Sequence, residues 1–504
     1  MSGSVLQKNN ISSISSLLAQ DPARITQMVI ESGDWRADFS GTPVTRSDWQ
    51  QWFEADQLKP LQTAVQDLFS GQIVNPSENQ PALHMALRAA DPALFSLDEA
   101  QSQSILQTRN QLLEWAGSLF RGETPIRTLL HVGIGGSDLG PRLVADALDA
   151  GQRAVRVEWL ASLDGRRLQR LLKTLDPATT GMMVASKSFG TVETRLQAEA
   201  IFDWLKHNLG DQAGQHCWAA TANEDRAIEF GIPADNIMAF PHWVGGRFSL
   251  WSSVGMSAAA LVGPDQWQAL LEGATEVDQT LRDQPQNSVA LALARTLYAL
   301  RGSFGFASLG VVSYEPGLRL LSEYLQQLIM ESLGKGVKAD GSELEEHTTP
   351  LIFGGAGTDL QHSLFQALHQ GTDRHPMLLL GAARPQHEFE AFHREQLSHL
   401  LAQASALVSG VDSENPQKQA PGNNPVMLML TPELSANSLG QLLATFEHAV
   451  YLLGCLWQIN PFDQWGVEDG KRRAGEIRKV LENDRDASEP NRNVRFLREH
   501  SSKP

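Results

Sequence analysis

The 504-residue sequence contains only two cysteines, Cys217 and Cys455, and fewer basic than acidic residues. Two cysteines exclude a disulfide framework and leave too few thiolates for a structural zinc site, which fits a reducing cytosol. The net charge of -17 argues against a general binder of nucleic acid or anionic membranes, because phosphate neutralisation needs a basic surface. Any phosphate that the protein binds must therefore meet local positive groups.

Long apolar runs are also missing. The polar start "MSGSVLQKNNISSISS" has no apolar stretch of the signal-peptide type, and the apolar runs are much shorter than the roughly 20 residues of a membrane span. These features favour a cytoplasmic protein that neither spans nor binds a membrane. With 504 residues, 42% of them hydrophobic, the chain is long enough for two or three domains.

The order of the apolar runs predicts two α/β domains. Residues 1–105 are rich in polar helix formers and lack clear strand runs, so we expect a helical N-terminal segment there. At 106–285 and again at 286–475, short apolar runs alternate with amphipathic stretches, which is typical of a parallel sheet with crossover helices. A charged tail follows at 476–504. The runs are "RTLLHVGI", "RAVRVEWL", "GMMVAS" and "CWAAT" in the first series, and "SLGVVSY", "PLIFGG", "HPMLLLG" and "PVMLML" in the second.

The run "LLHVGIGGSDLG" joins a predicted strand to a glycine turn and a polar helix start. Backbone N–H groups at Gly135, Gly136 and Ser137 could face an anion there. Nucleotide motifs fail on spacing, because Asp138 stands where a dinucleotide fingerprint needs its third glycine and Leu139 where a P-loop needs lysine. A tight turn that needs glycine only for its backbone remains the alternative.

A second polar loop, "SKSFGTVET", follows another strand of the same series. It offers the hydroxyls of Ser186, Ser188 and Thr191 and the ammonium of Lys187. A polar helix cap is the alternative, since serine and threonine cap helices widely. Because two strand ends of one parallel sheet have such loops, the pattern favours a small phosphomonoester at the carboxyl edge of the sheet.

Two further stretches offer groups for proton transfer. In "HWVGGRFSLWSS", Arg247 is a planar cation suited to an oxyanion, although an ordinary surface arginine fits equally well. In "EYLQQLIMESLGKG", Glu331 lies in the last turn before Gly334, where the negative end of the helix dipole disfavours a charged carboxylate. Such a group is a candidate general base. The alternative is a solvated glutamate paired with Lys335.

Histidine and lysine candidates occur nearer the C-terminus. His362 and His369 are seven residues apart in "GTDLQHSLFQALHQGT", so we expect them on one helical face about 10 Å apart, too far to share a metal ion. One of them is a candidate acid-base group, and a packed structural histidine is the alternative for each. "INPFDQWGVEDGKRRAGE" adds Gln464 and Lys471, for which a solvated basic helix face is the alternative.

Taken together, six blocks resemble the phosphoglucose isomerase family in their order along the chain: "VGIGGSDLGP", "SKSFGTVET", "VGGRFSLWS", "ESLGK", "GTDLQHSLFQALHQGT" and "FDQWGVEDGK". "PALHMALRAAD" also resembles the N-terminal part of the family, so the resemblance covers nearly the whole chain. It implies an α/β fold with two sugar-isomerase (SIS) domains, each a parallel sheet flanked by helices. It also implies a homodimer that needs no metal or redox cofactor.

The resemblance implies a role for each matching residue. Glu331 matches the proton-transfer base, and Arg247 matches the group that stabilises the enediolate. His362 matches the ring-opening histidine, which the family supplies from the neighbouring subunit, and Lys471 matches the residue beside it at the ring oxygen. The residues that match substrate-binding positions are Gly136, Ser137, Ser186, Lys187, Ser188, Thr191, Gln327 and Gln464.

The implied reaction is the reversible interconversion of glucose 6-phosphate and fructose 6-phosphate, a step of glycolysis and gluconeogenesis. A non-catalytic sugar-phosphate-binding protein with the same domains is the alternative. The set of Glu331, His362, Arg247 and Lys471 is complete, which favours the enzyme. Departures such as Leu333, where the family motif has asparagine, remove none of these four residues.

Overall fold

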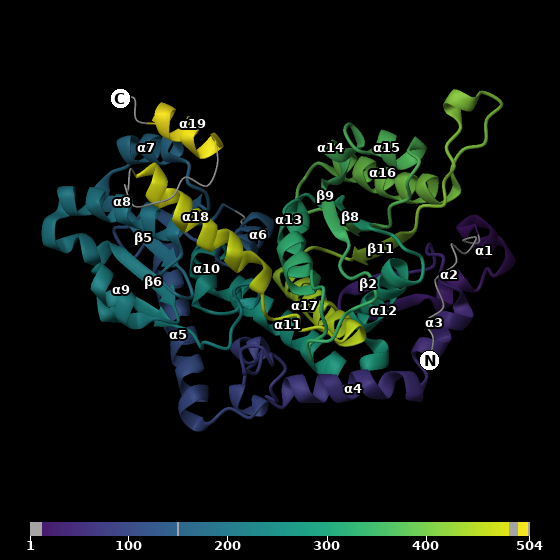
Figure 1. Cartoon of the computed structure of the whole chain (residues 1–504), viewed down its shortest axis with the longest axis horizontal. Coiled ribbons are helices and arrows are strands. Elements are labelled where there is room, and N and C mark those ends of the chain that lie inside the picture. The colour runs from purple at the N-terminus through teal and green to yellow at the C-terminus, as the bar shows by residue number, and fades with distance from the viewer. Residues whose placement is uncertain (1–12, 149–150, 483–491, 502–504) are drawn as a thin grey trace. The chain divides into compact units, whose positions relative to one another are not determined.

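Both predicted series of apolar runs form β-sheets in the computed structural model, which describes residues 13–148, 151–482 and 492–501. Figure 1 labels the elements of both sheets. The chain divides into a unit of residues 1–461, which contains the two sheets, and a second unit of residues 462–504. The boundaries proposed from sequence at 105, 285 and 475 remain predictions.

The first sheet has five parallel strands in the order β4-β3-β5-β6-β7. Every residue of β3 and β5 is buried, which explains why both strands read as continuous apolar runs. The first four strands confirm the predicted runs, whereas the three-residue β7 was too short to predict. The strands are β3 (Thr128–Val132), β4 (Arg156–Leu160), β5 (Thr180–Ala185), β6 (Cys217–Thr221) and β7 (Ile237–Ala239).

The second sheet has the order β1-β2-β11-β10-β8-β9. Its last four strands are mutually parallel and match the predicted second series. The N-terminal segment contains helices, as predicted, but also two strands that were not predicted: β1 and β2 form a hairpin, and β2 pairs antiparallel with β11. The strands are β1 (Val29–Ser32), β2 (Trp35–Asp38), β8 (Ser308–Ser313), β9 (Leu351–Ala356), β10 (Met377–Ala382) and β11 (Val426–Thr431).

The hairpin escapes a sequence reading because each strand has only four residues with mixed polarity, "VIES" and "WRAD". Its position is fixed by distant contacts instead. Trp35 and Ala37 are buried on one face, and the indole Nε1 of Trp35 donates a 2.7 Å hydrogen bond to the carbonyl of Ser438. Tertiary packing of this kind outweighs local propensity.

Helices account for most of the remaining structure, and α5 has clear start and stop signals in its sequence. α5 (Glu99–Arg121) begins at an Asp98–Gln101 capping box and ends at Gly122, whose φ is +73°. The others of the N-terminal part and first sheet are α1 (Ile14–Gln20), α2 (Arg24–Gln27), α3 (Arg46–Trp52), α4 (Ala55–Phe69), α6 (Leu139–Leu148), α7 (Gly165–Thr174), α8 (Val192–Leu209), α9 (Glu224–Phe230), α10 (Met256–Val262) and α11 (Pro264–Asp283).

Further helices surround the second sheet. They are α12 (Val289–Gly302), α13 (Leu321–Leu325), a π-helical segment (Gln326–Glu331), α14 (Gly357–Gln361), α15 (Phe365–Gln370), α16 (Glu390–Ser409) and α17 (Ala436–Trp457). The unit of residues 462–504 contains α18 (Glu468–Leu481) and α19 (Arg492–Ser501).

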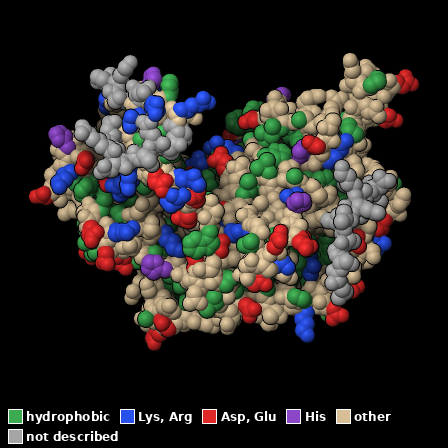
Figure 2. All heavy atoms as spheres, in the orientation of Figure 1, with side chains coloured by type: hydrophobic (Ala, Val, Ile, Leu, Met, Phe, Trp, Pro, Cys, Tyr) green, Lys and Arg blue, Asp and Glu red, His purple; other side chains and the backbone are tan. Residues whose placement is uncertain are grey.

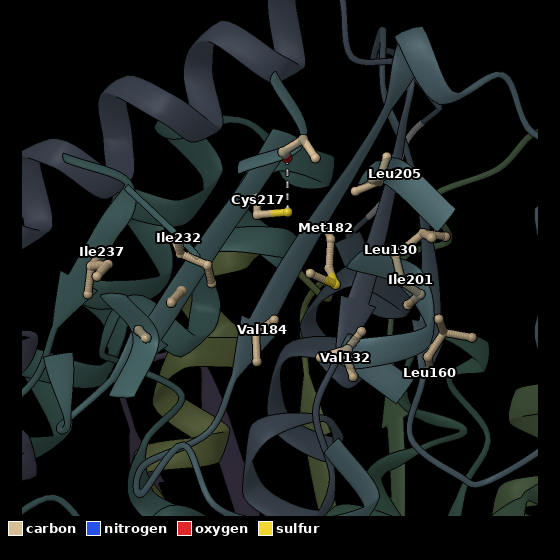
Figure 3. Packing of buried hydrophobic residues seen from close by; sticks show 14 residues of the cluster. Leu130, Val132, Leu160, Met182, Val184, Ile201, Leu205, Cys217, Ile232 and Ile237 are labelled. Carbon is tan, nitrogen blue, oxygen red and sulfur yellow. Dashed lines mark hydrogen bonds between the residues drawn. The ribbon is translucent and has the colours of Figure 1, made fainter. Parts of the chain in front are cut away.

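The core beneath the first sheet is a cluster of aliphatic side chains and Cys217 between the strands and their crossover helices (Figure 3). Leu130 and Met182 are fully buried, as are Ile201 and Leu205 of α8. Each such side chain contributes about 1.5–3 kcal/mol of burial free energy. The Cys217 thiol donates to the carbonyl of Ala213, and burial raises its pKa to about 12. It is therefore a core residue, not a reactive thiol.

α17 is the one helix in the described residues that is long and apolar enough to cross a membrane. Its most apolar window has a mean hydropathy of 1.3. The sequence predicted no apolar run long enough to span a membrane, so this helix was missed. In this structure 89% of that window is buried inside the protein, where α17 packs along α11. A helix that is buried on all sides reads as apolar all round, so its place in the core explains the composition.

A buried ionic network links the N-terminal segment to α11 and α17. Arg88 donates to both carboxylate oxygens of Asp278 at 2.6 and 2.8 Å and to Glu447 at 2.5 Å. His448 contacts Asp278 at 2.6 Å, and Glu447 also accepts the indole N–H of Trp251 at 2.7 Å. The network thus joins "PALHMALRAAD" to "GGRFSLWS", two blocks that lie far apart in the sequence.

One buried cation in this network faces two buried carboxylates. Burial alone would raise the pKa of Asp278, but the bidentate contact with Arg88 outweighs burial and lowers that pKa to about 2. Burial raises the pKa of Glu447 to about 7 despite the same cation. The two carboxylates share one positive charge, so the better-bonded one stays ionised while the other takes up a proton near neutral pH.

Replacing Arg88 by methionine should lower the free energy of unfolding by about 3–5 kcal/mol, because two buried carboxylates lose their cation. Without Arg88, burial places their folded-state pKa values above the unfolded ones. The folded variant then binds more protons than the unfolded chain, so the loss should be larger at pH 8 than at pH 5. Urea unfolding followed by tryptophan fluorescence at both pH values measures this difference.

Arg282 provides the matched control. It lies on α11, the helix of Asp278, but pairs with Asp283 at the surface. Arg282→Met should change the free energy of unfolding by less than about 1 kcal/mol at either pH. Equal, small losses for both arginine variants would contradict the structural importance of the network.

Candidate active site

The glycine turn after β3 lies against two other segments of the site. Gly135 has a φ of +59°, and a Cβ there would lie 2.8 Å from Nε2 of Gln327. A Cβ at Gly136 would lie 2.0 Å from the backbone carbonyl of Gly246. Glycine is therefore needed at both positions for close approach, and the turn brings Ser137 beside the segments that contain Gln327 and Arg247.

The predicted donors of this turn are only partly available. The N–H of Ser137 donates within the turn to the carbonyl of Ile134 at 3.2 Å, so its expected role as a free backbone donor was wrong. The turn closes as a short 3-10 helix, Gly135–Ser137, which uses that N–H group. Substrate contacts of Gly136 and of the Ser137 side chain remain predictions.

Glu331 lies at the end of the π-helical segment Gln326–Glu331. Its Oε2 accepts a 2.9 Å hydrogen bond from Nε2 of Gln327, and its Oε1 is 3.5 Å from Nη1 of Arg247. Lys335 instead donates to the backbone carbonyl of Glu331 at 2.9 Å. The alternative of a carboxylate paired with Lys335 is therefore not what the structure contains. π-Helical turns are rare in proteins, and those that occur are frequently at functional sites.

The guanidinium of Arg247 is fixed in the interior rather than at the surface. The residue is 3% exposed, Nε donates to the Ser332 hydroxyl at 2.6 Å, and Nη2 donates to the carbonyl of Pro461 at 2.6 Å. These two contacts orient the fork so that Nη1 faces the carboxylate of Glu331, which keeps 22% of its side-chain surface exposed. The carboxylate of Glu331 is thus accessible to a ligand, while the guanidinium beside it is immobilised.

The loop "SKSFGT" leaves β5 beside the glycine turn, because β3 and β5 are neighbouring parallel strands. The hydroxyl of Ser186 is buried and has no hydrogen-bond partner among the described residues. Thr191 is the N-cap residue of α8, yet its side chain makes no capping hydrogen bond. The Ser188 hydroxyl only accepts a 3.3 Å contact from the N–H of Gly190. The polar-cap alternative for this loop is therefore not supported.

Lys187 in the same loop is a partly desolvated cation. Burial lowers its pKa, the carboxylate of Glu78 opposes that shift, and the guanidinium of Arg247 adds to it. The interaction with Arg247 places Lys187 within electrostatic range of the Glu331 site. Two cations near each other, with hydroxyls beside them, form a favourable environment for an anion.

The predicted helical face of His362 and His369 was wrong. α14 ends at Gln361 with His362 as its C-cap residue, and α15 begins only at Phe365. His369 contacts Gln403 at 2.8 Å and packs on Phe365, so it is a structural residue. His362 is exposed. The apolar residues keep a helical spacing across the turn between α14 and α15, and no proline or glycine marks that turn. The sequence therefore read as one continuous helix.

Gln464 and Lys471 belong to the unit of residues 462–504. Lys471 is on α18, where its Nζ is 2.7 Å from the carboxylate of Glu468. Gln464 precedes the 3-10 helix Trp465–Val467. The local structure of α18 follows from its charge pattern, because acidic and basic residues alternate at spacings of three and four residues. Roles for Gln464 and Lys471 in the site remain predictions.

Three partners of the site were not predicted from sequence: Ser332, the carbonyl of Pro461 and His131 beneath the glycine turn. Ser332 follows Glu331 directly, but nothing in the sequence indicates that its hydroxyl orients an arginine 85 residues earlier.

Within the described residues, no group of three or more His, Cys, Asp or Glu side chains gathers in a way that could hold a metal ion. Figure 2 shows acidic and basic side chains interspersed over the face in view.

The candidate site combines a half-buried carboxylate, an immobilised guanidinium and two polar loops at the carboxyl edge of a parallel sheet, an arrangement that suits a sugar-phosphate isomerase. The sequence model described as phosphoglucose isomerase matches residues 38–496. The chain belongs to the phosphoglucose isomerase family.

Relatives and solved structures agree with this assignment. The chain is 39% identical over 476 residues to a glucose-6-phosphate isomerase of Stenotrophomonas maltophilia (strain R551-3), covering 93% of this chain and 92% of the relative. It is also 39% identical over 473 residues to one of Xanthomonas axonopodis pv. citri (strain 306), with the same coverage. A crystal structure of a glucose-6-phosphate isomerase from Chlamydia trachomatis D/UW-3/Cx superposes with a TM-score of 0.84 at 26% identity, covering 97% and 96% of the two chains.

Proposed function

We propose that the chain interconverts glucose 6-phosphate and fructose 6-phosphate by proton transfer through a cis-enediolate. The observation that supports this most strongly is the carboxylate of Glu331, which Gln327 and Arg247 hold beside the two anion-binding loops. The 39% sequence identity to a protein named glucose-6-phosphate isomerase, over 93% of this chain, supports the same reaction. The reaction belongs to glycolysis and gluconeogenesis, and we infer a cytoplasmic location from it.

Ring opening comes first. The cyclic sugar loses a proton from the hydroxyl on C1 while the ring oxygen O5 gains one, which breaks the C1–O5 bond and produces the open-chain aldose. We assign this transfer to His362 and Lys471, whose side chains can both donate and accept protons. The exposed position of His362 suits a group that acts on a ligand rather than within the core.

Isomerisation follows at C1 and C2. Glu331 removes the proton from C2 of the aldose, and the electron pair moves toward the C1 carbonyl to form the enediolate. Returning the proton to C1, with the hydroxyl proton passing from O2 to O1, produces the ketose. Arg247 stabilises the negative oxygens of the intermediate, because its guanidinium is already oriented and needs no reorganisation during the reaction.

Remote binding supports this chemistry. Ser186, Lys187, Ser188 and Thr191 hold the 6-phosphate, while Ser137 and Gly136 line the neighbouring turn. Gln327 and Gln464 position the sugar. Binding energy from the phosphate, which takes no part in the proton transfers, fixes C1 and C2 against Glu331. A protein that only binds sugar phosphates, the alternative function, has no need of the Glu331–Arg247 contact.

The chain also acts as a homodimer in this proposal, with His362 completing the site of the neighbouring subunit. Support comes from the family resemblance around His362 and from its exposure. In the part that the structure describes, the side chain of His362 forms no ion pair or hydrogen bond, so its imidazole is available to a second copy. No nucleic acid or membrane partner enters the proposal.

Glu331→Gln should separate binding from chemistry. We expect kcat to fall by at least about 100-fold, because glutamine cannot accept the C2 proton, while a sugar-phosphate inhibitor still binds. Lys187→Ala should instead raise KM by at least about tenfold through the lost charged contact. The assay couples conversion of fructose 6-phosphate to a glucose-6-phosphate dehydrogenase.

Glu323→Gln on α13 provides the matched control, because Glu323 is half exposed and pairs with Arg142 at the surface. It should keep near-normal turnover. Absence of activity in the unmodified protein would refute the proposed function, and near-normal turnover of Glu331→Gln would show that another group is the base.

Mixed dimers test the shared site. If Glu331 and His362 of one site come from different chains, a heterodimer of Glu331→Gln and His362→Ala subunits has one doubly defective site and one intact site. Random reassortment makes about half of the molecules heterodimers, so activity should recover to about a quarter of the unmodified value. The measurement is the coupled assay after the two variants are unfolded and refolded together.

Differential affinity tags verify that heterodimers have formed. If both residues act within one chain, every site keeps one lesion and activity stays near that of the parents. Verified heterodimers without a gain in activity would therefore exclude the shared site while leaving the isomerase reaction in place.

A further inference from the structure

His131 is the penultimate residue of β3, just before the glycine turn. The residue is fully buried, and both of its ring nitrogens have partners. Nε2 is 2.7 Å from the backbone carbonyl of Ser137, and Nδ1 is 2.8 Å from the hydroxyl of Ser257 on α10. The ring of Trp159 on the neighbouring strand β4 packs against the imidazole with centroids 4.7 Å apart.

The chemistry of these partners fixes the tautomer of the ring. A backbone carbonyl can only accept, so Nε2 must have the hydrogen and donate it to Ser137. In the neutral ring Nδ1 then accepts, and the hydroxyl of Ser257 donates to it. Burial lowers the pKa of His131 to about 4, so the ring is neutral at physiological pH. The Ser137 carbonyl thus selects the tautomer, and the Ser257 hydroxyl satisfies the other ring nitrogen.

The contact acts on a turn that has little room to move. A Cβ at Gly133 would lie 2.7 Å from the carbonyl oxygen of Ser137, and one at Gly136 would lie 2.0 Å from the carbonyl of Gly246. The turn is therefore held from below by His131 and packed on its other side against the loop that contains Arg247. A change in the orientation of the Ser137 carbonyl moves the Ser137 side chain and the Gly136 backbone together.

We propose that His131 is a positioning residue for substrate binding: with Ser257 it holds the Ser137 carbonyl and so fixes the turn that receives the sugar phosphate. This inference rests on the proposed function for the identity of the ligand. It goes beyond that function because His131 and Ser257 touch no reacting atom, yet their hydrogen bonds set the affinity of the site.

Two polar replacements of His131 distinguish positioning from burial. The side-chain nitrogen of glutamine reaches nearly the place of Nε2 and can donate to the Ser137 carbonyl, whereas that of asparagine reaches only the place of Nδ1. We expect His131→Asn to raise KM for fructose 6-phosphate and the Kd of inorganic phosphate by about three- to tenfold, as for a lost hydrogen bond to a buried acceptor. kcat should stay within about twofold. His131→Gln should keep both constants near their unmodified values.

A second Ser–His pair in the chain supplies the matched control. The hydroxyl of Ser308, at the start of β8, lies 2.7 Å from Nδ1 of His375, just before β10. Both residues are at the N-terminal ends of their strands, away from the carboxyl edge of the second sheet. His375→Asn should lower the thermal midpoint of unfolding as His131→Asn does, but leave KM and the phosphate Kd unchanged. If His131→Asn does not fold, Ser257→Ala tests the same inference. The ring then loses the hydrogen bond that holds Nδ1, so its contact with the Ser137 carbonyl is less firmly oriented and KM should rise by a smaller factor.

The measurements separate this inference from the proposed function. Isothermal titration with inorganic phosphate needs no turnover, so an inactive protein would refute the isomerase proposal while the phosphate Kd still tests His131. Unchanged phosphate affinity in a folded His131→Asn variant, or equal effects of the asparagine and glutamine replacements, would overturn the positioning role and leave only a structural one.

Discussion

The contact of Arg88 with two buried carboxylates is the constraint on which the active site depends. It joins the N-terminal segment to α11 through Asp278 and to α17 through Glu447. Glu447 also holds the indole of Trp251, four residues after Arg247 in the same loop. The loop that contains the guanidinium of Arg247 is therefore held by charges that lie outside the candidate site. Removing a buried charge partner costs several kcal/mol, so this network fixes the loop firmly.

Much of the sheet structure and most residues of the candidate site could be predicted from the sequence. Strands buried on both faces read as short apolar runs, which is why β3, β5, β8 and β10 matched their predicted positions. The glycine turn and the "SKSFGT" loop were recognisable because their residue types suit an anion at a strand end. Glu331 and Arg247 were recognisable as chemical types, and the resemblance to a known family gave them roles.

The remaining features depend on contacts between residues far apart in the sequence. The hairpin of β1 and β2 exists because β11 offers an edge, and four-residue strands have no periodicity strong enough to indicate it. The break between α14 and α15 separates His362 from His369 without a proline or glycine to mark it. The hydrogen bond from Arg247 to Ser332 spans 85 positions. Such contacts follow from packing, which local propensity does not determine.

The central claim is that Glu331 moves a proton between C2 and C1, and isotope exchange with solvent tests it most directly. A carboxylic acid formed during the reaction can exchange its proton with water before returning it. When glucose 6-phosphate is converted in deuterium oxide, fructose 6-phosphate should gain deuterium at C1, detected by NMR or mass spectrometry. Product that remains unlabelled after many reversible turnovers would indicate direct hydride transfer from C2 to C1 and would contradict the role of Glu331 as the base.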